Sequence, residues 1–117
     1  MFRFVVLLIV SFISAPVFAE ASYGALAAKA KATVVHGLKD PDSAKFRNIG
    51  IYKSTTGKGG VTACGEVNAK NAFGAYVGYK RFMLFDDIAL IEGQDSSGLT
   101  YEMLGPVLCY EKVAGAK

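Results

Sequence analysis

The hydrophobic pattern separates an apolar start from a longer part in which apolar and polar residues are mixed. Residues 5–13 are almost entirely apolar, Arg3 is the one charged residue before position 20, and Val17-Phe18-Ala19 places small residues at the −3 and −1 positions of a cleavage site. This pattern is typical of a secretory signal peptide, so we predict a leader over residues 1–19 and one mature domain over residues 20–117. An uncleaved membrane anchor is the alternative. The apolar run is shorter than the ~20 residues that span a bilayer, and no later run reaches that length.

A helical repeat of apolar positions follows. The repeat has the three-to-four-residue spacing of one helix face, and Lys29 and Lys31 lie off it. We therefore predict a helix over residues 22–38, with Ser22 as a candidate N-cap, and a turn over residues 38–43. The apolar face consists of Tyr23, Leu26, Ala27, Ala30, Val34 and Leu38.

Strand-like alternation begins after this turn. Residues 46–54 place Ile49 and Ile51 on one face, and residues 61–68 alternate in the same way. The Gly-rich segment 55–60 between them predicts a hairpin connection. On the second strand, one face carries Val61, Ala63, Gly65 and Val67, and the other carries Thr62, Cys64, Glu66 and Asn68.

Aromatic residues then recur at every third position from Phe73 to Phe85. This spacing fits a drifting helical face or a strand with aromatic residues on both faces. Gly74 and Gly78 disfavour a helix, and the Tyr, Val and Phe content favours a strand. We therefore predict a third strand over residues 75–85.

The remaining elements are short. Residues 88–92 predict a fourth strand, and residues 99–103 and 107–111 predict either a last strand or a short helix interrupted at Gly105-Pro106. Residues 114–117 predict a frayed tail. One helix followed by four or five strands predicts an α+β fold, in which the N-terminal helix packs on one face of a small antiparallel sheet.

The charge of the chain is mild. Residues after position 19 include 12 Lys and Arg and 10 Asp and Glu, a net charge of +2. The basic residues are spread out and form no run of the kind that binds nucleic acid. We therefore expect no nucleic-acid partner and, once the leader is removed, no membrane span.

Two cysteines follow the predicted leader, Cys64 and Cys109. Their separation excludes a C-x-x-C redox pair, and a zinc site needs about four ligands whereas His36 is the only histidine. An exported chain meets an oxidising compartment, so we predict one Cys64–Cys109 disulfide, no metal and no cofactor.

Candidate chemistry is concentrated in residues 65–82, where polar, aromatic and glycine residues are interleaved. Amides and aromatic faces beside glycines suit a ligand cleft or a protein-binding patch. The alternative is structural: Asn68 and Asn71 shape a turn, Glu66 pairs with Lys70 or Arg81, and the rings fill a core. The candidate binding residues are Glu66, Asn68, Lys70, Asn71, Tyr76, Tyr79 and Arg81.

Residues 38–48 (LKDPDSAKFRN) and residues 64–82 (CGEVNAKNAFGAYVGYKRF) cover 30 of the 98 residues after position 19. Both resemble sequence boxes of a group of small exported proteobacterial and phage-associated proteins, which read LKDPDSAxFRN and CGEVNAKNxxGGYxG. Ala75 stands where the group has a second Gly. The resemblance implies a family, but no activity, cofactor or catalytic residue.

We therefore expect a periplasmic or secreted protein-binding module whose candidate residues engage another envelope or secreted protein. An inhibitor of a cell-envelope hydrolase is one form, by analogy. A small envelope enzyme that uses Glu66 as acid/base, or a structural accessory of an envelope complex, is the alternative. No Ser lies in a nucleophile-elbow sequence and His36 has no assigned nucleophile, so the sequence does not favour an enzyme.

Overall fold

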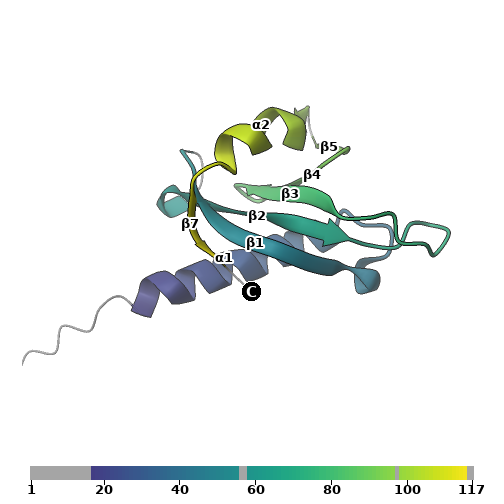
Figure 1. The fold of residues 1–117 in the computed structure, drawn as a ribbon, viewed down its shortest axis with the longest axis horizontal. Coiled ribbons are helices and arrows are strands. Elements are labelled where there is room, and N and C mark those ends of the chain that lie inside the picture. Colours follow the sequence, from purple (N-terminus) through teal and green to yellow (C-terminus); the bar gives the residue numbers. More distant parts are fainter. Residues whose placement is uncertain (1–16, 56–57, 97, 116–117) are drawn as a thin grey trace, which may run out of the picture.

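A five-stranded antiparallel sheet lies between two helices of unequal length (Figure 1). The computed structural model describes residues 17–55, 58–96 and 98–115. The helices are α1 (Val17–Val35) and α2 (Tyr101–Leu108), and short 3-10 turns lie at Pro41–Ser43 and Lys58–Gly60. No helix in the described part of the chain is long and apolar enough to cross a membrane.

The sheet has the strand order β4-β3-β2-β1-β7, so the last strand returns to pair with the first. Its strands are β1 (Lys45–Lys53), β2 (Val61–Asn68), β3 (Lys80–Phe85), β4 (Ile88–Ile91) and β7 (Lys112–Gly115). A separate pair, β5 (Asp95–Ser96) and β6 (Leu99–Thr100), leads into α2. Residues 69–79 connect β2 to β3 and extend past the end of the sheet (Figure 1).

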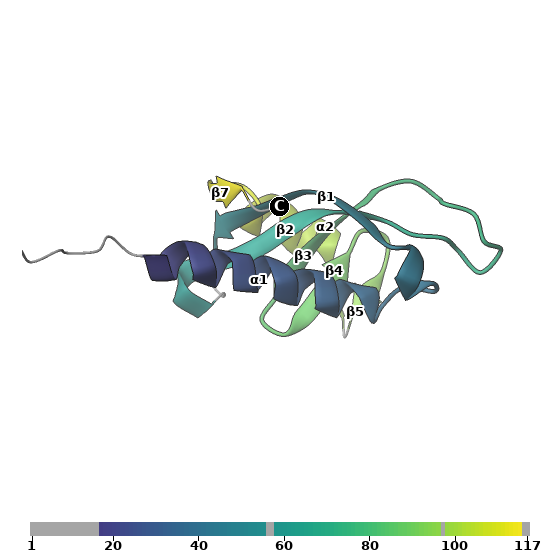
Figure 2. The ribbon, with the colours of Figure 1, turned by 90° about the horizontal axis from the view of Figure 1, so that it is seen from below.

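The first core layer joins α1 to the sheet, and Figure 2 shows the helix lying along the strands. Small helix residues, Ala27, Ala30 and Val34, let the backbone approach the strands closely. Phe46 adds its ring edge-on to buried Phe82, with 5.7 Å between the ring centroids. The strand residues of this core are Ile49, Ile51, Ala63, Val67, Phe82, Leu84 and Ile91.

The opposite face packs against α2 through Cys64, Met83, Leu90, Tyr101 and Leu108. A disulfide between Cys64 and Cys109, with Cα atoms 6.1 Å apart, ties central strand β2 to the end of α2. The Thr100 hydroxyl oxygen caps α2 by accepting from the Met103 N–H, 3.3 Å away. Gly105 is required in this helix, because a Cβ there would lie 2.5 Å from the Tyr101 ring.

The predicted α+β class, the two-faced β2 strand and the Cys64–Cys109 disulfide are confirmed. The alternation along β2 explains why: Ala63 and Val67 face α1, whereas Cys64 faces α2. The predicted leader over residues 1–19 falls on residues 1–16, outside the described part, and on the first residues of α1.

Four predicted elements need correction, one of them the interruption at Gly105-Pro106, because α2 runs through both residues. The helix runs from Val17 to Val35 and not over 22–38, so Ser22 lies inside it and is not its N-cap. The third strand begins at Lys80, because residues 75–79 belong to the loop. The segment predicted as a frayed tail contributes to edge strand β7, where Ala114 pairs with Ile51.

Candidate functional site

All seven candidate residues lie at one end of the sheet, on the end of β2, on the start of β3, or in the connection between them. We call this connection, residues 69–79, the projecting loop. Figure 1 shows it extending beyond the strands at the end of the molecule opposite the N-terminal end of α1. Hydrogen bonds within the loop and from the loop to the body fix its shape.

Asn71 organises the tip of the projecting loop. Its side-chain Oδ1 accepts from the backbone N–H groups of Phe73, at 2.9 Å, and Ala75, at 3.2 Å. Its own N–H donates to the Ala75 carbonyl at 2.9 Å, and the Gly74 N–H donates to the Asn71 carbonyl at 3.0 Å. Gly74 has a φ of +80°, which glycine adopts without strain. Ala75 does not have a positive φ, so this turn needs no second glycine there.

Three further hydrogen bonds attach the loop to the body. The Asn68 Oδ1 accepts from the Gly78 N–H at 3.1 Å, closing the base of the loop. The Lys70 N–H donates to the Ser43 hydroxyl oxygen at 2.8 Å, and the Tyr76 hydroxyl donates to the Ser43 carbonyl at 2.9 Å. The structural alternative for Asn68 and Asn71 is therefore confirmed, because both amides shape this turn.

The tip so fixed carries apolar side chains in contact with solvent. Phe73 is 96% exposed, and Val77 and Tyr76 are 55% and 39% exposed. Two ammonium groups flank the Tyr76 ring, Lys45 at 4.5 Å and Lys70 at 5.7 Å from its centroid. The end of the projecting loop therefore combines exposed aromatic side chains with neighbouring lysines.

Behind the loop, charges alternate across β1, β2 and β3 and on to Glu92, the residue that follows β4. Register places Arg47 of β1 opposite Glu66 of β2, and Glu66 opposite Arg81 of β3. Arg47 Nε donates to Glu66 Oε2 at 2.5 Å, and Arg81 Nε donates to Glu92 Oε2 at 2.9 Å. Like charges are thereby kept apart along the row.

Two tyrosine rings pack against the guanidinium groups of this row. Arg47 Cζ lies 3.7 Å from the Tyr79 ring centroid, and Arg81 Cζ lies 5.3 Å from that of Tyr101. Tyr79 thus braces the base of the projecting loop against β1. Such cation–π contacts contribute about 0.5–1 kcal/mol at exposed sites.

The hydrogen bond from Arg47 holds the pKa of the Glu66 carboxyl below its ordinary value, against the opposing effect of burial. Asn48 Nδ2 adds a donor at 3.1 Å, from a bulge of β1 where Asn48 has a φ of +54°. Glu66 is therefore ionised at neutral pH, when it cannot donate a proton. The predicted pairing of Glu66 with Lys70 or Arg81 is wrong, because Arg47 is its ion-pair partner.

Sequence reasoning missed the partners supplied by the segment before and within β1. Ser43, Lys45, Arg47 and Asn48 each contact a candidate residue. All four lie within residues 38–48, so the two sequence boxes meet physically at the base of the loop. The sequence Asn-Ala-Phe-Gly could have indicated Phe73 as a functional residue, because it places an aromatic residue inside a turn.

Within the described ranges, no three His, Cys, Asp or Glu side chains gather where they could hold a metal ion. Comparison with protein-family models, with curated proteins and with solved structures found no match. The functional assignment therefore depends on the geometry of the projecting loop and its surroundings.

Proposed function

We propose that this protein is an exported module that binds another envelope or secreted protein through the projecting loop. The observation that carries the proposal is the 96% exposure of Phe73 on a loop held in place by side-chain hydrogen bonds. An exposed ring contributes no burial free energy to its own fold. Large aromatic side chains are the residues that anchor protein interfaces when a partner buries them.

The order of the loop supports this function. A binding segment that is already held in one conformation loses less conformational entropy when it meets its partner. Asn71 fixes the tip, and Tyr76 and Asn68 fix its two arms. A small domain with such a presented loop suits an inhibitor or an accessory of a cell-envelope protein.

The charges around the tip indicate the partner surface that would fit. Lys45 and Lys70 lie beside the Tyr76 ring and form no ion pair with a described carboxylate. We infer a partner with an apolar pocket for the Phe73 ring and carboxylates at its rim, since complementary charges speed association and select partners.

Two observations support export and family membership. The Cys64–Cys109 disulfide is compatible with an extracytoplasmic location, because such bonds persist in oxidising compartments. The boxes LKDPDSAxFRN and CGEVNAKNxxGGYxG supply the two sides of the contacts at Ser43. We infer that the group which the sequence resembles shares this loop.

An acid/base enzyme built on Glu66 has less support. Arg47 and Asn48 both donate to Glu66 Oε2, and the pKa of Glu66 is lowered, which removes it from the proton-donor role at neutral pH. The structural-accessory alternative makes no demand on the loop tip, so the Phe73 experiment separates it from a binding module.

The test is capture from the native envelope fraction with the oxidised protein as bait, followed by mass spectrometry. Wild type is compared with Phe73→Ala and with Tyr110→Ala, because Tyr110 is 84% exposed and follows the C-terminal end of α2. We expect a stoichiometric partner that is lost with Phe73→Ala and kept with Tyr110→Ala. Equal capture by all three proteins would contradict the proposal.

A further inference from the structure

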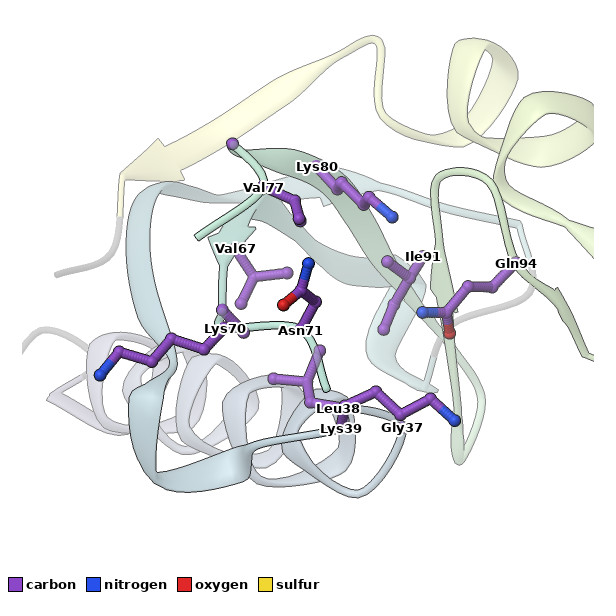
Figure 3. A pocket seen from close by; sticks show the side chains of 12 residues that line it. Gly37, Leu38, Lys39, Val67, Lys70, Asn71, Val77, Lys80, Ile91 and Gln94 are labelled. Carbon is purple, nitrogen blue, oxygen red and sulfur yellow. The ribbon is translucent and has the colours of Figure 1, made fainter. Parts of the chain in front are cut away.

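A cavity of about 130 Å³ lies on the α1 face of the sheet, beside the base of the projecting loop (Figure 3). Its apolar walls are Leu38, just after α1, Val67 of β2 and Ile91 of β4. Val67 and Ile91 are each 3% exposed, so these walls are backed by the core. Asn71 and Val77 of the projecting loop also line the cavity, whereas Phe73 does not.

Every titratable residue that lines the cavity is a lysine: Lys39, Lys70 and Lys80. None of the three forms an ion pair with a described carboxylate. In Figure 3 the Lys70 side chain extends away from the cavity on one side, Lys39 runs along the opposite edge beneath Gln94, and the Lys80 side chain ends above Ile91. The opening is therefore electropositive, and Lys39 and Lys80 are the cations to consider first.

Two amide groups add hydrogen-bond donors. The Asn71 Oδ1 is occupied by two loop N–H groups, so its Nδ2 is the group left to donate. Gln94 turns its amide toward the cavity (Figure 3), and its Oε1 lies 3.8 Å from the place that a Cβ on Gly37 would occupy. Neither side-chain nitrogen has a partner among the described residues, which leaves both available to an acceptor.

We propose that this cavity binds a small organic anion, a carboxylate attached to a compact apolar body. The carboxylate would accept from the Asn71 and Gln94 amides and lie near the Lys39 and Lys80 ammonium groups. The apolar body would replace water against the walls. An apolar cavity of about 150 Å³ holds a benzene ring, so a half-open cavity of 130 Å³ admits a ring with its carboxylate at the mouth.

This proposal is tested by titrating the oxidised, isotope-labelled protein with sodium benzoate at constant ionic strength and following its backbone amide signals. Benzyl alcohol supplies the same ring without charge, and inorganic phosphate supplies charge without a ring. We expect benzoate to give saturable shifts at Val67, Asn71 and Ile91. Benzyl alcohol should bind several-fold more weakly, and phosphate should shift none of these signals.

Variants locate the site and separate it from the loop function. The double change Lys39→Gln and Lys80→Gln should weaken benzoate binding about fivefold, as expected for two partly exposed charge contacts. Lys112→Gln removes a lysine on the opposite sheet edge and should change nothing. Phe73→Ala should keep benzoate binding, so failure of the protein-binding proposal would leave this one standing. Absence of saturable shifts, equal binding of benzyl alcohol, equivalent shifts with phosphate, or equal weakening by Lys112→Gln would overturn it.

Discussion

The hydroxyl of Tyr76 donates a hydrogen bond to the backbone carbonyl of Ser43, 33 positions earlier in the chain and 2.9 Å away. The Ser43 hydroxyl accepts from the Lys70 N–H and donates to the Asp40 carbonyl at 2.7 Å. Ser43, a single residue in the turn that precedes β1, therefore holds both arms of the projecting loop. The loop owes its shape to this distant anchor and to Asn71, and not to burial, since its tip is exposed.

Replacing Asn71 with Ala should loosen the loop without unfolding the protein. The change removes the acceptor of two backbone N–H groups in an exposed turn, so we expect unfolding free energy to fall by about 1 kcal/mol or less. Hydrogen exchange should show faster exchange at Phe73 and Ala75. Asn71→Asp, which keeps an acceptor oxygen, is the control and should retain most of the protection. Unchanged exchange in Asn71→Ala would mean that the loop is ordered by other contacts.

Replacing Glu66 with Gln distinguishes a binding module from an enzyme. Gln keeps an acceptor for Arg47 but cannot exchange a proton, so partner affinity should stay within about twofold. An acid/base enzyme would lose its activity with the same change. Partner affinity and catalytic activity are both measured for wild type and for Glu66→Gln. A catalytic activity in wild type that disappears in Glu66→Gln would reverse the assignment.

The ion pair between Glu66 and Arg47 predicts a specific pH dependence of the unfolding free energy. Because the folded pKa of Glu66 lies below its ordinary value of 4.5, its contribution is present above that pH and is lost as pH falls through the folded pKa. The difference in unfolding free energy between wild type and Glu66→Gln should therefore shrink on acidification below pH 4.5. Urea unfolding at several pH values measures it, and a difference that stays constant into strong acid would show that the Arg47 contact does not stabilise the carboxylate.

Tyr101 should ionise above the ordinary pKa of a tyrosine. Burial raises its pKa above the ordinary value of 10.0, although Arg81 opposes the shift. Because the folded pKa is the higher one, the fold loses stability as pH rises above 10.0. An absorbance titration of the six tyrosines should end in a late step that Tyr101→Phe removes. A titration curve of the same shape for both proteins would contradict the burial argument.

The disulfide should supply a large part of the stability. Cys64 and Cys109 are 45 positions apart, and closing a loop of that length stabilises a fold by at most about 4 kcal/mol in the chain-entropy model. Replacing both cysteines with Ala should lower the unfolding free energy toward that limit, measured by urea unfolding against the oxidised wild type. A loss well under 1 kcal/mol would show that α2 docks on β2 without the bond.

Much of the fold was predictable from the local pattern of apolar and polar residues. Alternation placed Ala63 and Cys64 on opposite faces, and the helical repeat placed Ala27, Ala30 and Val34 on the buried face of α1. These features were predictable because the apolar period of one element reports which of its faces is covered. The disulfide was predicted from the number of cysteines and from the oxidising compartment expected for an exported chain.

The features that were not predicted from the sequence depend on contacts between residues that lie far apart in the chain. Residues 75–79 resemble a strand in composition, but Asn68 closes a loop there by binding the Gly78 N–H. Lys112–Gly115 became a strand only because the outer edge of β1 offered it a partner. Glu66 paired with Arg47 because strand register put them opposite each other, and register is fixed across the whole sheet.

The central claim, that Phe73 is the anchor of a protein interface, is tested most directly by a photo-crosslinking side chain at position 73 in the living cell. The same side chain at position 110 is the control, because Tyr110 is also exposed but lies away from the projecting loop. The account predicts one discrete crosslinked partner from position 73, captured in the cell envelope, and none of that size from position 110. No crosslinked product from position 73, or the same products from both positions, would contradict it.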